Sequence, residues 1–130
     1  MEYVRSVLLI DDNPSCNFIM SEFIKLADPN IEVFEADSVE DAMEILANLP
    51  VCPEVIYVDV NMPVLNGFDF IERYEQGYLI NNPHSKIFML SSSLREEDKL
   101  RAMGHSCVKD FVSKNDIDSF LQSTLLKGVA

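Results

Sequence analysis

Three short segments of the chain are dominated by apolar residues, and each ends abruptly in polar side chains. The segments and the residues that follow them are 6–10 with Asp11, 55–58 with Asp59, and 86–90 with Ser91. Short apolar runs bounded by turn residues are typical of strands buried on both faces of a sheet. The segments 31–36 and 108–112 mix apolar with charged residues, which predicts strands at the edges of the sheet.

Between these strands, apolar residues recur at helical spacing after capping signals. Asn13 and Pro14 predict the N-cap and first position of a helix that ends near Asp28. We expect Ile19, Phe23 and Ile24 to form the buried stripe of this helix.

Four more helices are predicted further along the chain. They cover 38–49, 66–78, 93–104 and a last segment from about 115. Ser38 and Ser93 each precede an acidic residue by three positions, as in a capping box. One face of the last helix carries Ile117, Phe120, Leu121, Thr124 and Leu125.

Strand and helix therefore alternate five times, which predicts one α/β domain spanning residues 1–130. Parallel strands need crossover helices, and those crossovers are right-handed. With apolar strands inside and mixed strands outside, the expected sheet is doubly wound and flavodoxin-like, with strand order 2-1-3-4-5.

Composition narrows the class of protein. A net charge of −12 argues against a nucleic-acid partner, which would need a basic surface. Neither a signal peptide nor a membrane-spanning apolar run is predicted. The three cysteines have irregular spacing, which favours buried, reduced thiols in a cytoplasmic protein over disulfides or a zinc site.

The predicted topology brings five polar residues to one edge of the sheet: Asp11, Asp12, Asp59, Ser91 and Lys114. Three neighbouring carboxylates repel one another, and at least one pKa rises, unless a cation joins them. Oxygen ligands without histidine or cysteine favour Mg²⁺ or Mn²⁺. On their own, Asp11 and Asp12 are better explained as residues that stabilise the start of the first helix, and it is Asp59 and Lys114 that favour the cation site.

This set of groups suits one reaction in particular. A carboxylate at Asp59 can attack a phosphoryl group and form an aspartyl phosphate. A bound cation, Lys114 and Ser91 would then stabilise the three phosphoryl oxygens.

These residues resemble the response-regulator receiver domains of two-component signalling, over essentially the whole chain. Asp59, Met62, Pro63 and Gly67 reproduce the motif D-x-x-M-P-x-x-x-G around the phosphoacceptor. Asp11-Asp12 resembles the family's metal-binding acids.

The resemblance also implies roles for residues on the other strand ends. Ser91 would be the switch hydroxyl, Phe111 the switch aromatic and Lys114 the family's lysine, while the backbone carbonyl of Asn61 would be a further metal ligand. The chain departs from the family at Asn115, where proline is common, and at Ser92, where a smaller residue is usual. Ser92 remains an alternative to Ser91 as the moving hydroxyl.

The function implied is Mg²⁺-dependent acceptance of phosphate on Asp59 from a histidine kinase or phosphotransfer protein. Phosphorylation would switch a protein-binding surface made by the fourth helix, fifth strand and fifth helix, in a monomer or a phosphorylation-dependent dimer. We expect a stand-alone receiver, not an enzyme that turns over an external substrate.

Three other functions are weighed against this one. A pseudo-receiver that only binds partners would not need the complete set of site residues. A phosphatase with an aspartate nucleophile would need a second acid at position 61, where the chain has Asn61. A flavin protein of the same topology is rejected because Asp11 and Asp12 would repel the flavin phosphate.

Overall fold

The computed structural model describes residues 4–93 and 95–116. Its strands are β1 (Ser6–Ile10), β2 (Glu32–Ala36), β3 (Val55–Asp59), β4 (Lys86–Ser91) and β5 (Val108–Ser113). Its α-helices are α1 (Pro14–Ala27), α2 (Val39–Asn48), α3 (Gly67–Gly77) and α4 (Glu96–Met103). Short 3₁₀ turns follow α3 at Leu79–Asn81 and β5 at Lys114–Asp116.

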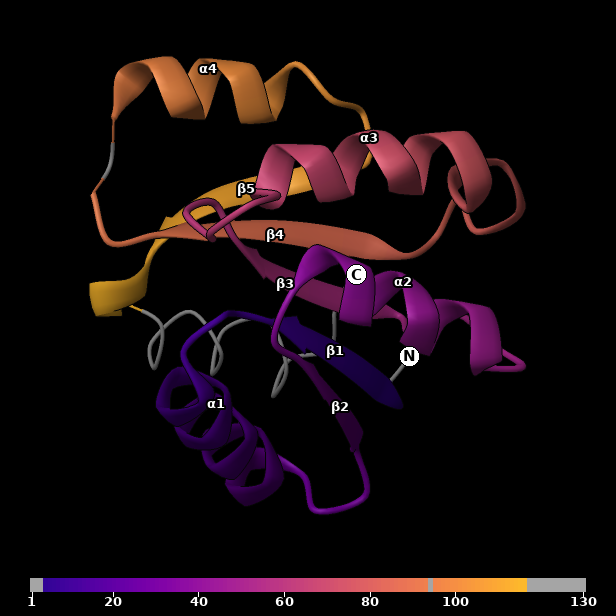
Figure 1. The fold of residues 1–130 in the computed structure, drawn as a ribbon. Helices are drawn as coiled ribbons and strands as arrows, with labels where there is room; N and C mark the ends of the chain where they lie inside the picture. The colour runs from indigo at the N-terminus through magenta and orange to yellow at the C-terminus, as the bar shows by residue number, and fades with distance from the viewer. Residues whose placement is uncertain (1–3, 94, 117–130) are drawn as a thin grey trace.

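The five strands form one parallel sheet in the order β2-β1-β3-β4-β5, so the predicted topology is confirmed. The sheet separates two clusters of buried side chains. One contains residues of α2, α3 and α4, and the other contains residues of α1, so helices cover both faces (Figure 1). The predicted fifth helix lies outside the described residues.

Helix α1 begins as predicted, but of the expected apolar stripe only Ile24 is buried. Asn13 is the N-cap, and its side chain accepts a hydrogen bond from the Ser15 N–H. The buried residues of α1 are Asn17, Met20, Ser21 and Ile24.

The expected burial of Ile19 and Phe23 is therefore wrong. These side chains are 52% and 42% exposed, and together with Phe18 and Leu26 they form an apolar stripe that faces away from the sheet. Periodicity did not distinguish the two faces because apolar residues occur on both.

Helix α4 also starts later than predicted. Its N-cap is Arg95, and no side chain caps its first turn, so the predicted capping box at Ser93 is wrong. Ser38 is confirmed as an N-cap, since its hydroxyl accepts from the Asp41 N–H, but the Asp41 carboxylate accepts from the Asp37 N–H and so does not complete the predicted capping box. None of the helices in the described ranges is long and apolar enough to span a membrane.

Candidate functional site

The carboxyl ends of four strands meet at the same edge of the sheet and carry the predicted site residues. Asp59 and Ser91 are the last residues of β3 and β4, while Asp11 and Lys114 directly follow β1 and β5. The register places Asp59 beside Leu90, and Ser91 beside Ser113. The parallel arrangement thus brings together side chains that lie far apart in the sequence.

The three acids form a compact cluster. Asp11, Asp12 and Asp59 each offer a carboxylate oxygen, and these atoms lie within 4.8 Å of one another. Asp11 and Asp59 are buried, whereas Asp12 is exposed. Clustered carboxylates at a partly open edge suit a hard divalent cation that keeps some of its water.

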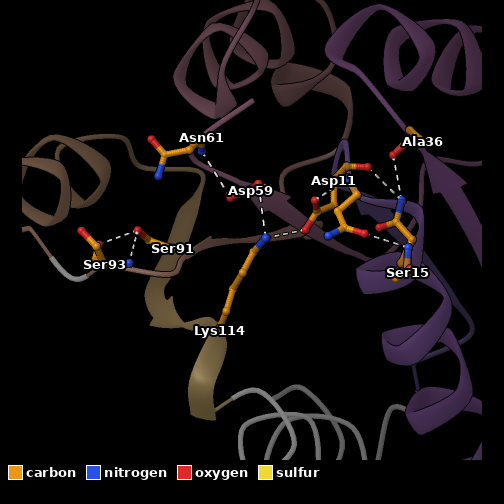
Figure 2. A network of polar contacts seen from close by, with 10 residues as sticks. Asp11, Ser15, Ala36, Asp59, Asn61, Ser91, Ser93 and Lys114 are labelled. Atoms are coloured by element: carbon orange, nitrogen blue, oxygen red, sulfur yellow. Dashed lines mark hydrogen bonds and ion pairs between the residues drawn. The ribbon is translucent and has the colours of Figure 1, made fainter. Parts of the chain in front are cut away.

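Lys114 lies between the two buried acids (Figure 2). Its Nζ atom is 2.6 Å from Asp11 Oδ2 and 3.3 Å from Asp59 Oδ2. Burial alone would lower the pKa of Lys114, but the hydrogen bond to Asp11 and the charge of Asp59 outweigh burial and raise it. The lysine is therefore held as a cation.

Asp59 is in the opposite electrostatic situation. Burial raises the pKa of its carboxyl above the ordinary value, and the positive charge of Lys114 offsets this only partly. The negative charge of Asp11 raises the pKa further, while the Asn61 N–H, 3.2 Å from Asp59 Oδ1, lowers it. The site is short of positive charge, which supports the fit of a cation to its oxygen ligands.

Ser91 is fully buried, and its hydroxyl is held by a neighbouring peptide. Its Oγ donates to the Ser93 carbonyl and accepts from the Ser93 N–H at 3.1 Å. Ser92 is exposed. Of the two candidate hydroxyls, Ser91 is the one that ends the strand beside Asp59 (Figure 2).

Two further predicted features are placed by β5 and the turn after it. Phe111 is 5% exposed and belongs to the core cluster on the side of α2, α3 and α4. No peptide bond in the described ranges is cis, so Lys114 and Asn115 are joined by a trans bond. The Asn115 N–H, which a proline would lack, donates to Ser113 Oγ at 3.2 Å.

The glycine of the motif is explained by a close approach to the phosphoacceptor candidate. A Cβ atom on Gly67 would lie 2.5 Å from the Asp59 backbone oxygen and 3.1 Å from Val60 Cα. Only a residue without a side chain lets α3 begin this close to the end of β3.

The loop between Asp59 and α3 contains strain that the sequence did not reveal. Val64 has a φ of 69° and is 97% exposed. The Leu65 N–H donates to the Pro63 carbonyl at 2.8 Å, which makes Val64 the centre of a γ-turn. A β-branched residue in this region is unfavourable by about 1–3 kcal/mol, and such strain is common beside functional sites.

Asn17 is a second residue that the sequence reading missed. It is 3% exposed, and its Nδ2 atom donates to the backbone oxygens of Asp11 at 3.1 Å and Ala36 at 3.0 Å. Its Oδ1 atom is buried and has no hydrogen-bond donor in the described part of the chain. A buried unpaired acceptor costs about 1–3 kcal/mol. The sequence signal that could have identified Asn17 is its spacing, since it lies one helical turn before Met20, on the same face of α1.

The cysteines are free thiols, as predicted, but only Cys107 is buried. Cys16 and Cys52 are partly exposed, so the expectation that all of them are buried is wrong. Burial raises the pKa of Cys16, and the charge of Asp11 raises it further, so the thiol form is favoured.

Comparisons with known proteins identify the family of the chain. The family model described as response regulator receiver domain matches residues 7–125. The nitrate/nitrite response regulator protein NarL of Escherichia coli is 31% identical over 98 residues, covering 75% of this chain and 43% of that protein. A protein-glutamate methylesterase/protein-glutamine glutaminase of Geobacillus kaustophilus is 32% identical over 111 residues, covering 83% of this chain and 29% of the enzyme. The chain thus spans less than half the length of these relatives.

Solved structures match over nearly the whole chain. A two-component response regulator from Cytophaga hutchinsonii is 29% identical with a TM-score of 0.80, covering 98% of this chain and 100% of that one. The chemotaxis protein CheY4 of Vibrio cholerae is 26% identical with a TM-score of 0.77, covering 95% and 98%.

Proposed function

Since the chain belongs to the response regulator receiver domain family, we propose that Asp59 accepts a phosphoryl group from a histidine kinase or a phosphotransfer protein. The observation that carries this proposal is the position of Asp59, a buried carboxylate at a strand end, with Lys114 3.3 Å away and two further acids beside it. A buried aspartate with a raised pKa needs such partners to remain ionised and nucleophilic.

In the proposed transfer, an oxygen of Asp59 attacks the phosphorus of a phosphohistidine. A P–O bond forms, the P–N bond breaks, and its electron pair returns to the imidazole nitrogen of the donor. Lys114 already lies between Asp11 and Asp59, so its ammonium group can pair with a phosphoryl oxygen after a small displacement.

The acids Asp11, Asp12 and Asp59 would hold Mg²⁺, or Mn²⁺, with the Asn61 carbonyl as a further ligand. The carboxylates supply the hard oxygen donors that either ion prefers, and their excess negative charge favours binding. When bound, the ion supplies positive charge that stabilises the phosphoryl oxygens during transfer.

The response to phosphorylation would begin at Ser91. A phosphoryl group on Asp59 offers Ser91 Oγ a charged acceptor in place of the Ser93 carbonyl, and charge-assisted hydrogen bonds are the stronger ones. Displacing Ser93 would shift the loop that leads to α4. The first turn of this helix has no side-chain cap. We propose that Phe111 then changes rotamer and that α4, β5 and the helix predicted after Asn115 bind a downstream protein.

The phosphodonor needs a docking surface near the carboxyl edge of the sheet. We propose the exposed stripe of α1, formed by Phe18, Ile19, Phe23 and Leu26, because α1 begins directly after the acidic pair. Exposed apolar groups that gather on one face mark protein-binding surfaces. Free thiols favour a cytoplasmic setting for this exchange.

A receiver of this kind phosphorylates itself once per activation and is not a turnover enzyme for an external substrate. The competing proposal is a pseudo-receiver that binds partners without phosphorylation. The presence of Asp11, Asp59 and Lys114 in contact with one another favours the phosphorylated receiver.

The test is phosphorylation by acetyl phosphate with Mg²⁺, followed by intact mass spectrometry. The expected result is a metal-dependent, hydroxylamine-labile phosphoryl adduct that Asp59→Asn abolishes. Absence of the adduct with both acetyl phosphate and a phosphohistidine donor would instead establish the pseudo-receiver. Cys16→Ser is a matched control, because it changes a nucleophilic side chain near the site but leaves Asp59 in place.

A further inference from the structure

We propose that Asn17 is a positioning residue that fixes the backbone carrying the metal-binding acids, so that the affinity for Mg²⁺ depends on it. This inference rests on the proposed function, because Asp11 and Asp12 are taken as the Mg²⁺ ligands. Asn17 itself lies near the start of α1, where its side chain contacts backbone oxygens.

The geometry joins three elements at one point. The Asn17 Nδ2 atom donates to the Asp11 and Ala36 backbone oxygens at 3.1 and 3.0 Å. The Asp11 N–H donates to the same Ala36 oxygen at 3.1 Å. The end of β1, the end of β2 and the buried face of α1 are therefore tied together at the residue that begins the acidic pair.

The orientation of the amide follows from its neighbours. These neighbours are the backbone oxygens of Asp11 and Ala36, which only accept hydrogen bonds. The amide nitrogen of Asn17 must therefore face them. The other end of the amide, Oδ1, is left buried without a donor in the described ranges. Met20 and Ile24 show that apolar side chains fit this face of the helix. The two hydrogen bonds that the Asn17 amide donates explain why an amide, and not an apolar side chain, occupies this position although its oxygen is unpaired.

These hydrogen bonds complete the support of Asp11. Its carboxylate accepts from the Asn13 N–H at 2.9 Å and from Lys114 Nζ at 2.6 Å. Its peptide is held by Asn17 and Ala36. Without the Asn17 side chain, the Asp11 carbonyl loses its link to the buried face of α1 and to the end of β2. The Asp11 and Asp12 carboxylates can then leave the positions that coordination requires. Residues that orient metal ligands in this way typically change metal affinity roughly 10–100-fold when removed.

The test compares Asn17→Ala and Asn17→Leu with Ser21→Ala in the metal-free protein. Ser21 is also buried, on the same face of α1 and one turn further from Asp11, so it is a matched control for loss of a buried polar group. Asn17→Leu keeps most of the side-chain volume and removes the unpaired oxygen, so it guards against a cavity effect in the alanine variant. Isothermal titration calorimetry with Mg²⁺ gives the dissociation constant, and urea unfolding in EDTA gives the stability.

We expect the Mg²⁺ dissociation constant to rise roughly tenfold or more in both Asn17 variants and to stay unchanged in Ser21→Ala. This result should hold whatever stability each variant loses. Unchanged affinity in the Asn17 variants, or an equal loss in Ser21→Ala, would overturn the inference.

The wild-type phosphorylation assay keeps the two proposals apart. If the wild type binds Mg²⁺ but takes no phosphoryl group, the proposed function fails, while the dissociation constants still decide the role of Asn17. If the wild type is phosphorylated and the Asn17 variants bind Mg²⁺ normally, only the inference about Asn17 fails.

Discussion

Replacing Asp59 with asparagine should make the metal-free protein more stable, although it removes the proposed phosphoacceptor. Asp59 is buried, and burial raises the pKa of its carboxyl, which means that the ionised form is unfavourable in the folded state. Asparagine has nearly the same shape and no charge. The substitution therefore removes the unfavourable ionisation without opening a cavity.

The magnitude follows from the charges around Asp59. At an effective dielectric constant of about 20, the attraction to Lys114 at 3.3 Å is about 5 kcal/mol, and repulsion from a carboxylate that lies within 4.8 Å is at least about 3.5 kcal/mol. Two such carboxylates, of which Asp12 is exposed and therefore screened, roughly balance the lysine. The cost of burying the charge is then decisive, and we expect Asp59→Asn to gain about 1–2 kcal/mol.

The assay is urea unfolding of wild type and Asp59→Asn in EDTA across a range of pH. A raised folded-state pKa means that the folded protein binds this proton more tightly than the unfolded chain. The variant's gain in stability should be complete above the pKa that Asp59 has in the folded protein. It should disappear as the pH falls below the pKa of aspartate in the unfolded chain. Equal or lower stability of the variant at neutral pH would refute the reasoning, as would a difference that grows toward acid.

The other predictions concern the strained loop, the motif glycine and the stripe of α1. Val64→Asn should raise the free energy of unfolding by about 1 kcal/mol, because asparagine tolerates a positive φ better than valine. A lower free energy of unfolding in urea would contradict the inference that Val64 is strained. Gly67→Ala should lower the free energy of unfolding by about 1–3 kcal/mol, because the new methyl group would clash with the Asp59 backbone oxygen. Unchanged stability would disprove that contact. Ile19→Glu should leave the rate of phosphorylation by acetyl phosphate unchanged and slow transfer from a phosphohistidine protein roughly tenfold. Ile80→Glu, an exposed apolar residue beyond the end of α3, is its control, and equal slowing by both would exclude the α1 stripe as the docking surface.

The sheet and its acidic edge could be predicted because their signals are local and strong. An apolar run such as 55–58 fits a strand buried on both faces and few other structures. Once the strand order is known, geometry alone brings Asp11, Asp59 and Lys114 to the same edge. No long-range contact had to be guessed.

The errors occurred where local pattern and tertiary contact disagree. On α1, Asn17 and Ser21 are buried while Phe18 and Ile19 are exposed, which reverses the usual assignment of polar and apolar faces. The burial of Asn17 depends on the Ala36 carbonyl of another strand, which no helical periodicity can reveal.

The capping prediction at Ser93 failed for a similar reason. The backbone of Ser93 binds the Ser91 hydroxyl, and the helix begins only after Arg95. A contact between strand end and loop therefore replaced the helix cap that the local spacing suggested.

The ion pair between Lys114 and Asp11 joins residues 103 positions apart in the sequence. During synthesis, Asp11, Asp12 and Asp59 leave the ribosome long before the lysine that lies between them. A nascent chain that has formed only β1 to β3 would already bring Asp11, Asp12 and Asp59 together. It would lack the positive charge of Lys114 until β5 had joined the sheet. Under the proposed function, competence for phosphorylation would therefore arise only once β5 has paired with β4.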